Sequence, residues 1–118
     1  TERIPVKIAI LNNAYLGMVR QWQEMFYDER YSSVFLDSAN VPNFVMMAES
    51  MGCIGILVES PEEVGPAIEK VNSISDRSVV IEFRTDASEK VFPMVPAGAS
   101  NDDVILHPTQ QDRKDGLT

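Results

Sequence analysis

Two adjacent asparagines, Asn12 and Asn13, directly follow the nearly continuous apolar run VKIAIL at residues 6–11. An amide oxygen is a neutral, hard ligand that suits Mg²⁺ or Ca²⁺, and backbone carbonyls of the next turn could add further oxygens. A helix beginning at Leu16 or Gly17 would also point its first N–H groups at an anion. Together these groups would suit a diphosphate. The simpler interpretation is a strand-ending turn in which an asparagine caps the helix.

Strands and helices that would position these amides alternate along the chain. Apolar runs predict strands at residues 6–11, 53–59 and 78–83, of the kind that is buried on both faces of a parallel sheet. Helical periodicity predicts helices at 16–27, at 43–51 and beyond residue 60. This order predicts an α/β fold, part of a three-layer domain around a parallel sheet. Three strands form a thin sheet that needs cover, and the chain begins without methionine, so we expect further strands upstream.

Residues that favour helix ends support this reading. Pro42 is expected in the first turn of the helix at 43–51, and Gly52 is a plausible cap at its end. Ser60 and Glu63 have the spacing of a capping box at the start of the next helix.

Composition excludes several classes of partner. The 118 residues are 44% hydrophobic and suit one globular domain, and a net charge of −8 without a basic run argues against nucleic acid. No apolar run approaches the roughly 18 residues that a membrane helix needs. The single cysteine, Cys53, allows no internal disulfide and fits a reducing cytoplasm. His107, the one histidine, is a poor metal or triad candidate without Cys or His partners.

The block LNNAYLGMVRQWQEMFYDERYS resembles the thiamine-diphosphate-binding domain at the C-terminus of acetolactate synthase (acetohydroxyacid synthase) catalytic large subunits. The stretches NFVMMAESMGCIGILVESPEE and VFPMVPAGASNDDVI are similar to the same family, so the resemblance covers residues 4–105. It implies that residues 1–105 are the C-terminal portion of that domain. The polar composition of residues 106–118 predicts a flexible tail. In the family a Gly-Asp-Gly opens the metal and cofactor motif that Asn-Asn closes. The Gly-Asp-Gly would lie upstream of Thr1.

The resemblance also implies roles for single residues near the asparagines. Asn13 matches a metal ligand that uses its side-chain oxygen, and Tyr15 matches the position that gives a backbone carbonyl to the same metal. Leu16, Gly17 and Met18 match residues that lie against the cofactor, and glycine lets backbone approach closely.

A substrate channel is implied by the same resemblance. Its residues match Met18, Val19, Trp22 and Ala97, and the last two also match herbicide-sensitive positions of the family. Phe26 is expected in the core. No catalytic residue is expected in this chain, because the glutamate that activates the cofactor belongs to a partner subunit in the family.

The implied activity is that of a thiamine-diphosphate-dependent transferase in branched-chain amino acid biosynthesis. It condenses two pyruvates, or pyruvate and 2-ketobutyrate, to 2-acetolactate or 2-aceto-2-hydroxybutyrate with release of CO₂. The implied cofactors are thiamine diphosphate, Mg²⁺ and FAD, the last bound mostly outside this chain. The implied partners are the rest of the catalytic subunit, a homodimer partner and a regulatory small subunit, in the cytoplasm. By itself the chain should be inactive.

Two alternatives stay open at the level of sequence. One is a sister thiamine-diphosphate decarboxylase or oxidase of 2-keto acids, which shares the Asn-Asn pair. The other is a non-catalytic α/β interaction module. A dinucleotide-binding domain is weaker, because no G-x-G-x-x-G follows a strand.

Overall fold

The structure is a computed structural model that describes residues 4–36 and 41–106. The chain divides into two compact units, Thr1–Ser88 and Glu89–Thr118, and each is described by itself. The predicted division at residue 105 stays a prediction, and His107 with the rest of the predicted tail beyond Leu106 lies outside the described residues.

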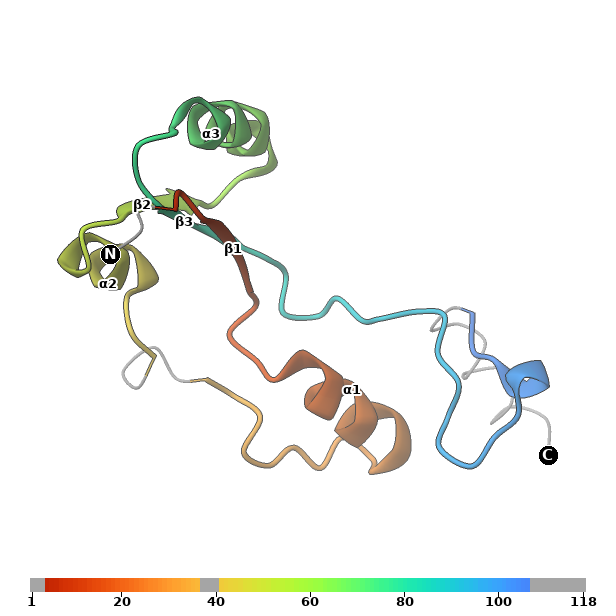
Figure 1. The fold of residues 1–118 in the computed structure, drawn as a ribbon. Helices are drawn as coiled ribbons and strands as arrows, with labels where there is room; N and C mark the ends of the chain where they lie inside the picture. The colour runs from red at the N-terminus through yellow and green to blue at the C-terminus, as the bar shows by residue number, and fades with distance from the viewer. Residues whose placement is uncertain (1–3, 37–40, 107–118) are drawn as a thin grey trace. The chain divides into compact units, whose positions relative to one another are not determined.

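The first unit alternates strands and helices, as the sequence predicts (Figure 1). Its elements are β1 (Lys7–Asn12), α1 (Gly17–Phe26), α2 (Phe44–Ser50), β2 (Ile54–Val58), α3 (Pro61–Ser73) and β3 (Val79–Arg84). The second unit contains a short 3₁₀ helix, Asn101–Asp103, and an antiparallel bridge between Met94 and Ile105. No helix in the described ranges is long and apolar enough to cross a membrane.

The sheet has the order β1-β3-β2, and both pairs of strands are parallel. The last strand in sequence is therefore the central one. Its register places Arg84 beside Asn12 of β1 and Glu82 between Ile10 and Leu57. Because parallel strands end at the same edge of a sheet, the residues that follow β1 and β3 start from neighbouring points. The predicted α/β fold with a parallel sheet is confirmed.

Helices lie on both faces of the sheet, with α3 on one side and α2 on the other (Figure 1). The core between α3 and the sheet is built around Val58, Ala67, Val71, Val79 and Ile81. On the other side α2 approaches β2 closely. A Cβ added at Gly55 would lie 2.7 Å from the Val45 carbonyl oxygen, so only glycine allows this spacing.

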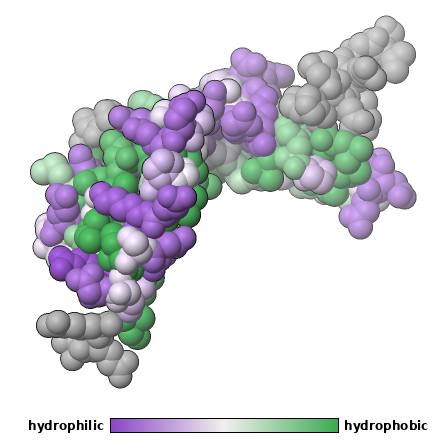
Figure 2. Space-filling model, turned by 90° about the horizontal axis from the view of Figure 1, so that it is seen from above, coloured by the Kyte–Doolittle hydropathy of each residue, from purple (hydrophilic) through white to green (hydrophobic). Residues whose placement is uncertain are grey.

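The expectation that the strand at residues 6–11 is buried on both faces is wrong for β1 within the described residues. Ile8 is 47% exposed and Leu11 is 73% exposed. The reason is the position of β1 at the edge of the sheet, where it has a neighbouring strand on one side only. An apolar composition suits a buried strand but does not determine where the strand lies in the sheet. Hydrophobic surface is also visible between hydrophilic side chains in the view from above (Figure 2).

The start of α3 follows its sequence signal. The helix begins at Pro61, and the Glu63 carboxylate accepts the backbone N–H of Glu59 at 2.9 Å and that of Ser60 at 3.0 Å. These two bonds, the first above all, hold the pKa of the Glu63 carboxyl below its ordinary value. The predicted capping box is confirmed.

The two ends of α2 differ in how well the sequence predicts them. Pro42 does not lie in the first turn, since Asn43 is the N-cap and its side-chain oxygen accepts the Met46 N–H at 2.9 Å. At the other end Gly52 has φ +76° and, with Cys53, closes the last turn by bonds to the carbonyls of α2. The predicted glycine cap is confirmed.

Replacing Gly55 with alanine is expected to lower the free energy of unfolding by about 1–3 kcal/mol, because its Cβ would meet backbone of α2. Urea unfolding of the protein measures the effect. Gly65→Ala is the matched control. Apart from its chain neighbours and the backbone of its own helix, nothing lies within 4 Å of its Cβ position. The gain in helix propensity is opposed by the proline that follows, so the change should stay under about 1 kcal/mol. Equal effects of the two substitutions would contradict this account of the α2–β2 packing.

Candidate functional site

The chain turns sharply where β1 ends, through two successive asparagine turns. The Asn12 side-chain oxygen accepts the N–H of Ala14 at 3.0 Å, and the Asn13 oxygen accepts that of Tyr15 at 3.1 Å. Ala14 has φ +59°, a left-handed conformation that costs a residue with a Cβ roughly 1 kcal/mol. The side-chain bonds of the asparagines hold the chain in this conformation.

A second segment fixes the same loop from the side. Leu16 donates its N–H to the Val34 carbonyl at 2.9 Å, and Leu36 donates to the Ala14 carbonyl at 2.8 Å. These bonds form the antiparallel bridge between Tyr15 and Phe35. The carbonyl of Tyr15 takes part in neither bond, so the bridge does not use it.

The side chain of Tyr15 helps to hold the loop as well. The centroid of its ring lies 5.2 Å from the centroid of the Phe35 ring. The guanidinium of Arg20, a residue of α1, lies 4.4 Å from the centroid of the Tyr15 ring. Arg20 also donates to the Ala87 carbonyl. The ring therefore connects the loop both to the bridge and to the helix that follows.

The first helical residue leaves room for the amide of Asn13. A Cβ added at Gly17 would lie 3.1 Å from the Asn13 side-chain nitrogen, which is tighter than an ordinary contact. The N-cap residue, Leu16, gives no side-chain bond, and the first turn of α1 has no acidic residue. The N–H groups that start α1 are thus not satisfied by a capping side chain, which is the usual condition for anion binding at a helix start.

The donor set of this loop fits a hard divalent cation. An amide oxygen has two lone pairs, and the Tyr15 N–H uses one pair of Asn13. The second lone pair of Asn13 and the carbonyl of Tyr15 are oxygen ligands of the kind that Mg²⁺ prefers. Within the described ranges no three His, Cys, Asp or Glu side chains gather to hold a metal. This chain can therefore supply part of a magnesium site, which other groups must complete.

The expected channel residues on α1 are accessible within the first unit. Met18 is 45% exposed and Val19 is 48% exposed, while the Trp22 ring meets that of Phe26 edge-on at 5.1 Å. The expectation that Phe26 is core is wrong for the described chain, since it is 38% exposed. The hydrophobic stripe of α1 contributes little to the core of this unit. The buried residue of this helix is the polar Gln21.

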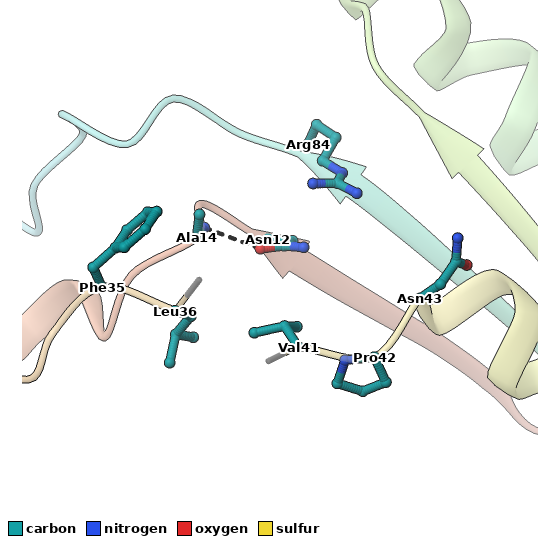
Figure 3. A pocket seen from close by; sticks show the side chains of 8 residues that line it. All are labelled: Asn12, Ala14, Phe35, Leu36, Val41, Pro42, Asn43 and Arg84. Carbon is teal, nitrogen blue, oxygen red and sulfur yellow. Dashed lines mark hydrogen bonds between the residues drawn. The ribbon is translucent and has the colours of Figure 1, made fainter. Parts of the chain in front are cut away.

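Beside the turn there is a pocket of about 300 Å³ (Figure 3). Arg84 and Asn12, the last residues of β3 and β1, lie on one side of it, and Ala14 continues that wall into the turn. The rest of the lining comes from Phe35, Leu36, Val41, Pro42 and Asn43. The pocket thus opens at the carboxyl edge of the parallel sheet, where ligands of such folds collect.

Ala97 lies in the second unit. It is exposed and stands in a tight turn in which Ala99 donates its N–H to the Pro96 carbonyl at 3.0 Å and Gly98 has φ +82°. Its role in a channel stays a prediction, as do the cofactor and metal roles of the residues on the loop.

Sequence reasoning missed Glu82 and Arg84. The Glu82 side chain is 3% exposed, and its Oε1 accepts from Asn12 Nδ2 at 2.6 Å and pairs with Arg84 Nε at 3.0 Å. The available signal was a single carboxylate inside the apolar strand VVIEFR. A buried charge in such a run requires polar partners. Asn12 and Arg84, at the ends of β1 and β3, are these partners.

Comparison with known proteins yields one family and several close relatives. The model of the family described as thiamine pyrophosphate enzyme, C-terminal TPP binding domain, matches residues 1–83. Acetolactate synthase of Mycobacterium leprae is 49% identical over 105 residues, 87% of this chain and 17% of the relative. The acetolactate synthase large subunit of Corynebacterium glutamicum is 50% identical, with the same coverage. The isozyme 3 large subunit of Escherichia coli K12 is 38% identical over 112 residues, 92% of this chain and 19% of the relative. The chain spans about a fifth of the length of these relatives.

Gly17→Ala is expected to weaken magnesium binding by about tenfold without loss of stability. Its Cβ would lie 3.1 Å from Asn13 Nδ2, so the amide would have to shift slightly, whereas alanine suits a first helical position and Gly17 is not in a left-handed conformation. Magnesium titration and thermal unfolding of the full-length protein measure the two quantities, with Gly65→Ala as control. An unchanged half-saturating Mg²⁺ concentration would show that the clearance at Gly17 does not determine the position of the amide.

Proposed function

The chain belongs to the thiamine pyrophosphate enzymes, as part of their C-terminal TPP binding domain, and from this premise we propose that it is a segment of an acetolactate synthase catalytic large subunit. The single observation that carries the proposal is the loop at the carboxyl edge of the sheet. There Asn13 Oδ1 accepts the Tyr15 N–H and keeps a second lone pair, and the Tyr15 carbonyl takes no part in the bridge. Identities of 38–50% to proteins named acetolactate synthase support the choice within the family.

The proposed reaction joins two pyruvates, or pyruvate and 2-ketobutyrate, with release of CO₂. Thiamine diphosphate supplies the electron sink for the decarboxylation. In this proposal Asn13 gives its amide oxygen and Tyr15 its backbone carbonyl to Mg²⁺, whose charge offsets that of the diphosphate. Gly17 keeps the helix start clear of the amide, and Leu16 and Met18 lie against the cofactor.

The exposed face of α1 is proposed to shape access for the second keto acid. Met18 and Val19 present apolar surface that the described first unit does not cover, and Trp22 is half-buried on the same helix. Apolar walls exclude water, which favours transfer to the second keto acid over protonation by solvent. We include Ala97 in the same channel on the strength of the family resemblance.

The rest of the site is proposed to come from outside these residues. The loop gives two ligands, and Mg²⁺ takes near-octahedral coordination, so an upstream aspartate, the diphosphate and water are expected to complete it. The glutamate that activates the cofactor is assigned to a homodimer partner. FAD is assigned mostly to another domain, regulation to a small subunit, and the location to the cytoplasm.

Asn13→Ala in the full-length subunit is expected to raise the half-saturating Mg²⁺ concentration for thiamine diphosphate binding by at least about tenfold, because a direct ligand is lost. Asn72→Ala, which removes an exposed amide on α3, is the control and should leave binding unchanged. Product analysis should find acetolactate from pyruvate. An aldehyde product would identify a sister decarboxylase, and no joint binding of cofactor and metal would refute the proposed function altogether.

Residues 1–118 alone are expected to form no acetolactate from pyruvate with Mg²⁺, thiamine diphosphate and FAD. They hold part of a metal site and lack the activating carboxylate of the proposed partner. A colorimetric assay of acetolactate measures this, with the full-length subunit as positive control. Turnover by the isolated chain would contradict the assignment of the missing groups.

A further inference from the structure

We propose that Glu82 is a positioning residue for the metal-binding loop, which it orients through the side chain of Asn12. The inference rests on the proposed function, since it assumes that Asn13 and Tyr15 ligate Mg²⁺. It adds a residue outside the loop, on the central strand of the sheet, to the groups on which magnesium affinity depends.

Glu82 stands where a carboxylate is costly. It lies on β3 between Ile10 and Leu57 of the two neighbouring strands, and its side chain is 3% exposed. A buried carboxylate needs hydrogen bonds or an opposite charge. Both come from the carboxyl edge of the sheet, as Asn12 donates to it and Arg84 pairs with it.

The contact with Asn12 fixes the orientation of an amide that has two different ends. Nδ2 donates to Glu82 Oε1 at 2.6 Å, and Oδ1 accepts the N–H of Ala14 at 3.0 Å. If the amide were reversed, its oxygen would face the carboxylate and its NH₂ group would face the Ala14 N–H. Glu82 therefore selects the one orientation in which Asn12 can hold the turn.

That turn leads directly to the proposed ligands. Ala14 is in a left-handed conformation, and the bond from its N–H to Asn12 holds it there. Asn13 precedes Ala14 and Tyr15 follows it. A change at Glu82 therefore reaches both proposed ligands through a chain of hydrogen bonds, Arg84 to Glu82 to Asn12 to the turn.

The test uses the full-length subunit and Mg²⁺ titration at saturating thiamine diphosphate, with thermal unfolding of the metal-free protein in parallel. Asn12→Asp sets two carboxylates against each other, and Glu82→Gln places a donor as well as an acceptor beside Asn12, so residue 82 no longer selects one orientation of the amide. Each is expected to raise the half-saturating Mg²⁺ concentration about tenfold or more. The double variant restores one hydrogen bond with donor and acceptor exchanged, so its Mg²⁺ affinity should return to within about threefold of wild type. Glu62→Gln, an exposed carboxylate at the start of α3, should change nothing.

Each other outcome overturns the inference. If Asn13→Ala loses Mg²⁺ while both single variants bind it as wild type does, Glu82 does not position the loop and the proposed function stands. If the losses of the single variants simply add in the double variant, the two residues act separately. If a single variant fails to fold and the double variant fails as well, the two residues also act separately. If wild type binds no Mg²⁺ with the cofactor, the proposed function falls and the inference with it.

Discussion

Parallel pairing of β1 and β2 with the central strand β3 is the constraint on which the rest of the structure depends. Parallel strands cannot be joined by tight turns, so each connection must cross over, and α2 and α3 in these connections cover the two faces of the sheet. The same pairing brings all carboxyl ends to one edge. It is why Asn12 and Arg84, which are 72 positions apart, occupy paired places in the register. The pairing of the strands alone therefore brings Asn12 and Arg84 together at this edge.

Beyond the edge of the sheet, side chains rather than secondary structure determine the path of the chain. Two asparagine turns, a left-handed alanine and a short bridge to residues 34–36 hold the loop before α1 begins. Their hydrogen bonds use the N–H groups of the loop and leave the Tyr15 carbonyl out of the bridge. The N–H groups of the loop are thus held in place, while the second lone pair of Asn13 and the Tyr15 carbonyl are oxygens of the kind that a hard cation prefers. The apolar face of α1, in contrast, stays largely exposed within this unit.

Local signals in the sequence predict most of the elements, because each depends on a few neighbouring residues. The strands, the capping box of Glu63 and the glycine cap at Gly52 follow from composition and spacing. Signals that depend on distant partners fail. The apolar run of β1 does not reveal that the strand lies at an edge, and the periodicity of α1 does not distinguish a core face from an accessible one, as Phe26 shows. The amide pair predicts a ligand loop, whereas the hydrogen bond between Asn12 and Glu82 depends on a register that only the folded sheet supplies.

The burial of Glu82 is better explained by orientation than by stability. Removing a carboxylate from water has a large cost, and an ion pair that includes a half-exposed arginine recovers only part of it, so a hydrophobic residue would serve the sheet at least as well. What a hydrophobic residue lacks is an acceptor for the Asn12 amide. Without that acceptor only the Ala14 N–H would distinguish the two ends of the amide, and the turn would be held less firmly. The carboxylate therefore orients the asparagine that holds the turn, and its position on the most enclosed strand keeps that orientation constant.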